Sequence, residues 1–159
     1  MTFEQAVEVP APAAAVFALT QDYGRRLSWD PFLRSAELVP PATAAGPGAR
    51  AYCVARVGLG METEYVTFRP PALAAVRMTR GPRRLAGFAG SWRFREVRPG
   101  CTRVAFRYQV RARPRWLAWA LDPVLGAVFR WETRRRLEAL RGAFARARPQ
   151  GQSGGRDAR

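Results

Sequence analysis

The chain has 159 residues and contains no histidine, lysine, asparagine or isoleucine. Without histidine it cannot hold a Ser-His-Asp or Cys-His catalytic site, or a metal ion bound by imidazole. Without lysine, Schiff-base chemistry and a Ser-Lys dyad are excluded as well. The only cysteines, Cys53 and Cys101, lie within apolar or β-branched runs, which predicts two buried free thiols and no metal site.

Targeting and membrane-spanning signals are also scarce. The N-terminal segment carries Glu4 and Glu8 where a signal peptide would carry basic residues, so we expect a cytoplasmic protein. Residues 116–131 are almost uncharged, but they fall short of the ~20 residues that cross a bilayer. Their tryptophan and leucine side chains either pack into the core or lie on a membrane surface, which leaves peripheral membrane association as an alternative.

The composition supports one domain with a strongly basic surface. Apolar residues make up 48% of the chain, enough for one core, and we expect a single domain over residues 1–148. Residues 149–159 lack any apolar pattern, which predicts a disordered basic tail. The net charge is +15, and residues 69–159 hold 22 of the 27 arginines but only 5 of the 12 acids. This asymmetry indicates either a solvated surface shaped by coding bias or a face that binds an anionic partner.

Apolar periodicity and proline or glycine breaks divide the chain into an α+β order of elements. Most of the segments are short strands between turns, as in an antiparallel meander. The expected order is a strand at 3–9, a short helix from 13 to about 22, a second helical piece around 25–27, strands around 34–39, 50–58, 61–69, 73–80, 85–97 and 101–113, and a long helix after residue 115.

The hairpin at Arg98-Pro99-Gly100 can be predicted in register. A three-residue loop, with Gly100 in the left-handed conformation, makes one face of the two arms wholly apolar or aromatic. The opposite face then carries arginines and places Arg95 directly across from Arg103, so that face must be solvated. The predicted inward pairs are Phe88 with Val110, Gly90 with Tyr108, Trp92 with Phe106, and Phe94 with Val104.

The last helix has an apolar stripe and an arginine-rich remainder, and Pro123 either interrupts it or starts it. The stripe that we expect to face the core consists of Phe129, Thr133, Leu137, Leu140 and Phe144. The arginines that we expect mostly on the remaining surface are Arg134, Arg135, Arg136, Arg141 and Arg146.

Three local stretches carry a family resemblance. The segment 9–19, the Asp22-Tyr23 pair and the Trp29-Asp30-Pro31 tripeptide resemble the opening of START-like, polyketide cyclase/dehydrase-type proteins of the SRPBCC superfamily. Residues 134–140, Arg-Arg-Arg-Leu-Glu-Ala-Leu, are similar to the end of their last helix, so the resemblance spans roughly residues 3–147.

The resemblance implies a helix-grip fold of the α+β class. In this fold a curved antiparallel β-sheet wraps around a long C-terminal helix, with two short helices after the first strand. A cavity between sheet and helix holds an apolar molecule. Functions in the superfamily run from lipid and quinone binding through polyketide cyclisation to ribosome association, and no catalytic residue set is common to them.

We therefore expect a carrier or sequestering protein for a small hydrophobic molecule such as a lipid, an isoprenoid quinone or a polyketide-like compound. Aromatic side chains beside Gly90 suit an apolar pocket, and the Tyr65 and Tyr108 hydroxyls are its candidate polar groups. The same residues could instead be ordinary core. The predicted pocket wall comprises Trp29, Tyr65, Met78, Trp92, Phe94, Phe106, Tyr108 and Phe129.

Two other functions stay open at this point. A cyclase or dehydratase acting without metal or histidine would rely on Tyr65 or Tyr108, but we assign no catalytic residue, no cofactor and no metal ligand. An interaction protein would use its arginine face on an anionic membrane or on ribosomal RNA and would bind with steep salt dependence. That anion-binding face comprises Arg93, Arg95, Arg103, Arg107 and Arg111.

Overall fold

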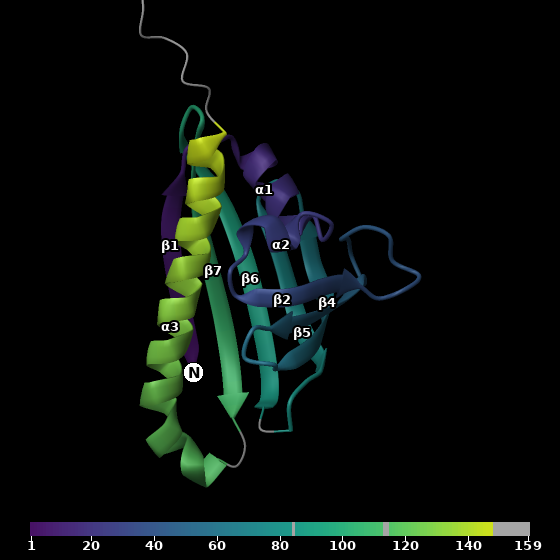
Figure 1. Cartoon of the computed structure of the whole chain (residues 1–159), viewed down its shortest axis with the longest axis vertical. Helices are drawn as coiled ribbons and strands as arrows, with labels where there is room; N and C mark the ends of the chain where they lie inside the picture. Colours follow the sequence, from purple (N-terminus) through teal and green to yellow (C-terminus); the bar gives the residue numbers. More distant parts are fainter. Residues whose placement is uncertain (84, 113–114, 148–159) are drawn as a thin grey trace, which may run out of the picture.

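The computed structural model describes residues 1–83, 85–112 and 115–147, and its elements follow the predicted order (Figure 1). The tail predicted at 149–159 lies outside these residues. The helices are α1 (Ala13–Gln21), α2 (Arg26–Trp29) and α3 (Arg115–Arg146). The strands are β1 (Thr2–Val9), β2 (Leu33–Leu38), β3 (Arg50–Ala55), β4 (Gly60–Arg69), β5 (Leu73–Arg80), β6 (Leu85–Arg98) and β7 (Cys101–Ala112).

The described strands form one seven-stranded antiparallel sheet in the order β1-β7-β6-β5-β4-β3-β2. Helices α1 and α2 carry the chain from β1 at one edge of the sheet to β2 at the other edge. Register shifts in the β4–β5 and β2–β3 pairs mark irregularities of the kind that increase strand twist, and the sheet curls beside α3 (Figure 1). The predicted helix-grip α+β fold is confirmed.

The β6–β7 hairpin has the predicted register at every inward pair. Trp92 lies opposite Phe106, and Arg95 lies opposite Arg103 on the outer face. Gly100 adopts a φ of 70°, the left-handed conformation that the turn requires. The loop itself is shorter than predicted, because Arg98 pairs with Cys101 and only Pro99 and Gly100 lie between them. An irregularity between Glu96 and Arg98 adds one residue to β6, so the strands keep the predicted register.

Helix α3 is continuous from Arg115, and Pro123 lies inside it. Its predicted stripe faces the sheet: Thr133, Leu137 and Leu140 are buried, and Phe129 and Phe144 are half-buried against the core. The prediction that the arginines of this helix lie mostly on the surface holds for Arg134, Arg135, Arg141 and Arg146 but is wrong for Arg136, which turns inward.

Both cysteines are free thiols, with Cys101 buried and Cys53 half-buried. No helix in the described part of the chain combines the length and apolarity that crossing a bilayer requires. The side chains of the uncharged segment that starts at Trp116 are described only in part. Within that segment Val128 and Trp131 are exposed, so its contact with a membrane stays a prediction.

Candidate functional site

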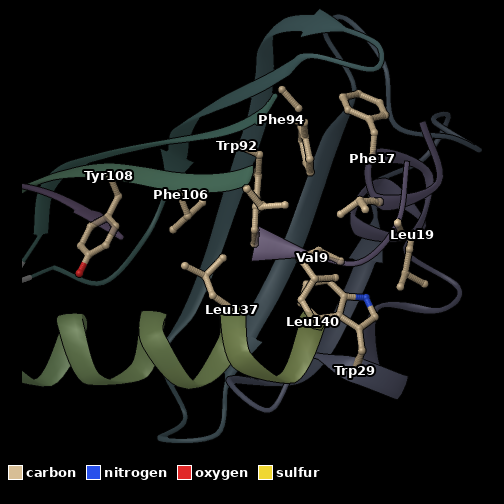
Figure 2. Close-up of a cluster of buried hydrophobic side chains, with 14 of the residues drawn as sticks. Val9, Phe17, Leu19, Trp29, Trp92, Phe94, Phe106, Tyr108, Leu137 and Leu140 are labelled. Carbon is tan, nitrogen blue, oxygen red and sulfur yellow. The ribbon is translucent and has the colours of Figure 1, made fainter. Parts of the chain in front are cut away.

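The inward faces of β6 and β7 form a continuous aromatic wall, as the alternating pattern of the two strands predicts (Figure 2). The rings of Trp92 and Phe106 are 4.5 Å apart between centroids, and those of Phe106 and Tyr108 are 5.7 Å apart. Leu137 and Leu140 of α3 pack toward this wall from the other side (Figure 2). Sheet and helix therefore enclose one aromatic interior.

A small cavity remains in this interior between β6, β7 and α3. Its volume is about 40 Å³, which leaves room for only a few water molecules. We call it the helix-side cavity, and its lining comprises Phe32, Phe88, Phe106, Tyr108, Phe129, Glu132, Thr133 and Arg136.

The predicted pocket wall is only partly brought together at this cavity. Three of its eight residues, Phe106, Tyr108 and Phe129, line it. Trp29, Tyr65, Trp92 and Phe94 are buried members of the same aromatic core, and Met78 is half-buried on β5.

A larger cavity of about 440 Å³ lies at the opposite end of the core, where α1 and the following turn approach the β2–β3 loop. This volume falls within the range of ordinary small-molecule pockets. We call it the loop-side cavity, and Phe17, Gln21, Tyr23, Ala45 and Phe68 belong to its lining. None of the eight predicted wall residues lines it.

A hydrogen-bonded polar network borders the loop-side cavity. The Tyr65 hydroxyl donates to the Gln21 side-chain oxygen at 2.8 Å and lies 3.2 Å from the Tyr23 hydroxyl. Gln21 in turn donates to the Thr20 hydroxyl at 3.1 Å. Burial raises the pKa of both Tyr65 and Tyr23, so these hydroxyls are neutral hydrogen-bonding groups at physiological pH.

Between the two cavities lies an ionic cluster, formed by Arg26, Asp30 and Arg136 and here called the Arg-Asp-Arg cluster. Asp30 Oδ2 accepts from Arg26 Nε at 2.9 Å and from Arg136 Nε at 2.7 Å. The Asp30 side chain is fully buried, and those of Arg26 and Arg136 are only 8% and 12% exposed. The cluster joins the short helix α2 to α3 across 106 residues of sequence.

Aromatic rings surround the two guanidinium groups of this cluster. The Arg26 and Arg136 guanidinium carbons lie 5.6 and 5.5 Å from the centre of the Trp92 ring. Arg136 also lies 5.5 Å from Phe106, and Arg26 lies 5.0 Å from Trp29, so cation–π attraction compensates part of the lost hydration.

The arginines also fix the charge of the buried carboxylate. Burial alone would raise the pKa of Asp30, but the charges of Arg136 and Arg26 outweigh it and hold that pKa below its ordinary value. Asp30 is therefore ionised at neutral pH, and the cluster carries two positive charges and one negative charge.

Two buried polar atoms in the described residues, Tyr108 Oη and Trp29 Nε1, have no hydrogen-bond partner within 3.5 Å, although the Thr133 side chain lies close enough to Tyr108 to lower its pKa. Tyr108 is 1% exposed and lines the helix-side cavity, and its hydroxyl points toward α3 (Figure 2). Burial raises the pKa of Tyr108 by more than Thr133 and Arg130 lower it, which keeps this hydroxyl protonated at neutral pH. An unpaired buried hydroxyl costs free energy of about 1–3 kcal/mol, so the site favours an occupant that accepts a hydrogen bond.

The predicted anion-binding face lies on the outer side of the sheet, away from the cavities. Arg93, Arg95, Arg103 and Arg111 are exposed there, and Arg107 is half-buried. Strand β1 places Glu4 beside Arg107 and Glu8 beside Arg103, which lowers the positive potential at that edge. Binding of membranes or RNA by this face stays a prediction.

Acidic side chains elsewhere act as partners of arginine. Glu62 and Glu64 of β4 pair with Arg50 and Arg77 at 3.3 and 3.2 Å. Among the described residues, no group of three or more cysteine, aspartate or glutamate side chains is placed to hold a metal ion.

Sequence reasoning missed the Arg-Asp-Arg cluster, although it noted the Trp29-Asp30-Pro31 tripeptide for its resemblance. One local signal was available, because Arg26 and Asp30 are four residues apart and can pair within a helical turn. The contribution of Arg136 has no local signal, since its partner lies 106 residues earlier.

Comparison with known proteins agrees with this architecture. A family model described as polyketide cyclase / dehydrase and lipid transport matches residues 1–145. The solved structure of the Zhui aromatase/cyclase from a Streptomyces species has a TM-score of 0.79 and 18% identity, covering 96% of this chain and 99% of that chain. A START superfamily protein from Mycobacterium smegmatis has a TM-score of 0.74 and 12% identity, with coverage of 91% and 97%.

The di-domain ARO/CYC protein BexL has a TM-score of 0.68 and 21% identity, covering 89% of this chain and 45% of that chain. At such identities the likeness to solved structures establishes the fold alone. A comparison with curated proteins found no match.

Proposed function

The chain belongs to the family of polyketide cyclase/dehydrase and lipid transport proteins, and on that premise we propose that it binds a small hydrophobic molecule between the sheet and α3. A lipid, an isoprenoid quinone or a polyketide-like compound fits this description. The protein would act as a carrier or sequestering protein for that molecule.

The observation that carries the proposal is the buried Tyr108 hydroxyl, which has no hydrogen-bond partner within 3.5 Å, in a cavity lined mainly by aromatic rings. It is buried, it lines the helix-side cavity, and the rings of Phe32, Phe88, Phe106 and Phe129 line the same space. Ligand pockets typically combine an apolar lining with a few polar groups that fix orientation. Tyr108 supplies such a group, because its hydroxyl can donate to a carbonyl or hydroxyl oxygen of the bound molecule.

Binding requires the helix-side cavity to expand, since about 40 Å³ cannot contain a lipid or a quinone. Phe88 and Phe129 are half-buried, whereas Phe106 and Tyr108 are buried. Moving the half-buried rings aside loses less packing than moving the buried ones. We therefore place the apolar part of the ligand where Phe88 and Phe129 now lie.

Titration with the neutral apolar dye Nile red tests this location. Phe129→Ala enlarges the helix-side cavity and should tighten dye binding several-fold, because the ring no longer has to be displaced. Val128→Ala is the matched control, since this neighbouring side chain on α3 is exposed and should leave binding unchanged.

The loop-side cavity is the competing location for the dye. Ala45→Trp narrows that cavity and should leave dye binding unchanged if the ligand lies beside α3. Dye binding that is lost in Ala45→Trp but unaltered in Phe129→Ala would move the ligand to the loop-side cavity. Absence of saturable binding in the wild-type protein would overturn the proposed function itself.

A cyclase or dehydratase is the second candidate, and the position of the Tyr108 hydroxyl favours it. A protonated phenol inside an apolar cavity can polarise a carbonyl group of a polyketide-like substrate. Tyr65 is less suited to this role because its hydroxyl already bonds Gln21 and lies against Tyr23. Turnover of such a substrate that is unchanged in Tyr108→Phe would remove this residue from the mechanism.

A further inference from the structure

The Arg-Asp-Arg cluster of Arg26, Asp30 and Arg136 carries one more positive than negative charge. From this imbalance we infer that the molecule bound beside α3 is an acid, with an apolar body and a carboxylate or similar anionic oxygen that meets Arg136 and Tyr108. The inference rests on the proposed function and names the chemical class of its ligand.

The single carboxylate of the cluster is fully engaged. Its Oδ2 atom faces both arginines, and its Oδ1 atom accepts from the Phe32 backbone N–H at 3.1 Å. Among the described residues, Asp30 is the only acidic group within 4 Å of the Arg26 or Arg136 side-chain nitrogens. Removing a charged group from water is costly unless an opposite charge compensates it. A second anion at this position would balance the cluster.

Of the two arginines, Arg136 is the one that faces the cavity. Arg26 divides its donors between Asp30 and the Thr20 carbonyl oxygen, and it does not line the helix-side cavity. Arg136 directs Nε and one terminal nitrogen toward Asp30, and its other terminal nitrogen, Nη1, has no acceptor among the described residues. Because Arg136 lines the cavity, this donor is available to an occupant.

Neutral donors lie beside this charge. The Tyr108 hydroxyl is buried without a partner and lines the same cavity, as does the Thr133 side chain. An arginine together with a phenol hydroxyl can bind both oxygens of a carboxylate, and charge-assisted hydrogen bonds of this kind are stronger than neutral ones. The cavity therefore offers an anion both charge and directed donors.

One acidic group, Glu132, also lines the cavity and limits where an anion can lie. Its nearest cation is Arg135 at 3.9 Å, and its side chain is 23% exposed, so it stands toward the solvent side of the lining. Glu132 lies one helical turn before Arg136 on α3, so its repulsion would keep the bound anion close to the Arg136 and Tyr108 donors. The apolar body would then extend into the space that Phe88 and Phe129 now occupy.

The opposing explanation is that the cluster serves the fold alone. Cation–π contacts with Trp92 and Phe106 would compensate the excess charge without any ligand. Under that explanation an acid and a neutral molecule of the same shape bind equally well, whereas our inference predicts that the acid binds more tightly.

The test uses naphthoate and naphthamide, which share ring and shape and differ in charge, as competitors of Nile red at neutral pH. In the wild-type protein naphthoate should compete roughly tenfold to a hundredfold better than naphthamide, as expected for a charge-assisted hydrogen bond. Arg136→Gln should abolish that preference, so that the two compounds compete equally in this variant. Arg134→Gln removes the same charge from an exposed neighbour on α3 and should keep the preference.

Tyr108→Phe covers the case in which Arg136→Gln does not fold. It should reduce the preference for naphthoate over naphthamide by several-fold, both affinities being measured in the same variant. Equal competition by the two compounds in the wild-type protein, or displacement by neither of them, overturns this inference while Nile red binding preserves the proposed function. If Nile red itself does not bind, the proposed function fails first and the inference fails with it.

Discussion

The substitution Asp30→Asn tests the energetic role of the Arg-Asp-Arg cluster. It keeps the shape of the side chain but removes the negative charge between Arg26 and Arg136, and these two cations then face each other in a buried site. Removing one partner of a buried ion pair costs about 3–5 kcal/mol. Because Asp30 serves two arginines, we expect a loss of at least about 3 kcal/mol in the free energy of unfolding.

Urea unfolding followed by circular dichroism measures this loss. The matched control is Glu138→Gln, which breaks an exposed pair with Arg134 on α3, where the two side chains are 61% and 75% exposed. Exposed pairs of this spacing contribute about 0.3–0.5 kcal/mol, so the control should unfold almost like the wild type. A loss below about 1 kcal/mol in Asp30→Asn, similar to the control, would refute the reasoning.

The pH dependence of the same variant gives an independent check. The arginines lower the pKa of Asp30, so its contribution to stability is fully present above the unfolded value of about 3.9. That contribution disappears as the pH falls from there through the lower folded value. Asp30→Asn should therefore show a shallower loss of stability with acid than the wild type. Equal slopes would contradict an ionised, doubly paired Asp30.

Further predictions concern the core, the hairpin and the buried phenol. Leu137→Ala should lower the free energy of unfolding in urea by about 2–5 kcal/mol because this side chain of α3 is buried. Leu27→Ala should change that free energy little because Leu27 is 49% exposed. Equal effects of the two substitutions would contradict the packing of α3 against the sheet. Gly100→Ala should lower the free energy of unfolding by about 1–2 kcal/mol because the residue has a φ of 70°. Gly46→Ala, where the added methyl group also meets open space, should leave that free energy unchanged. An unchanged free energy of unfolding in Gly100→Ala would contradict the turn geometry. Burial raises the pKa of Tyr65, so the contribution of this residue to stability is present below the unfolded pKa of about 10 and declines as the pH rises above it. Tyr65→Phe should therefore reduce the loss of stability at alkaline pH. The same loss in the variant and the wild type would contradict the burial of Tyr65.

Periodicity was sufficient to predict the aromatic wall. Trp92, Phe94, Phe106 and Tyr108 alternate with charged or small residues, so only one register of the hairpin buries all of them together. The register of the strands does not determine the length of the loop, since a bulge near Arg98 gives the same register with a shorter turn. Strand faces are set by many side chains at once, whereas one turn depends on one or two residues.

The Arg-Asp-Arg cluster could not be predicted in the same way. Arg136 follows two exposed arginines on a basic helix, and a third arginine there normally indicates a solvated position. Its side chain is only 12% exposed because Asp30, Trp92 and Phe106 contact it from distant parts of the chain. The cavity volume could not be predicted either, because it depends on how closely side chains such as Phe88 and Phe129 fill the space. The periodicity of the sequence does not determine that packing.

Native mass spectrometry of the protein after a high-salt wash tests most directly whether it binds a small hydrophobic molecule. The account predicts an adduct of roughly a few hundred daltons, as suits a small-molecule site, which solvent extraction releases as an apolar acid. It also predicts that protein incubated with Nile red shows an adduct of one dye molecule per chain. A spectrum that shows only the bare chain, both as purified and after incubation with Nile red, would contradict the central claim.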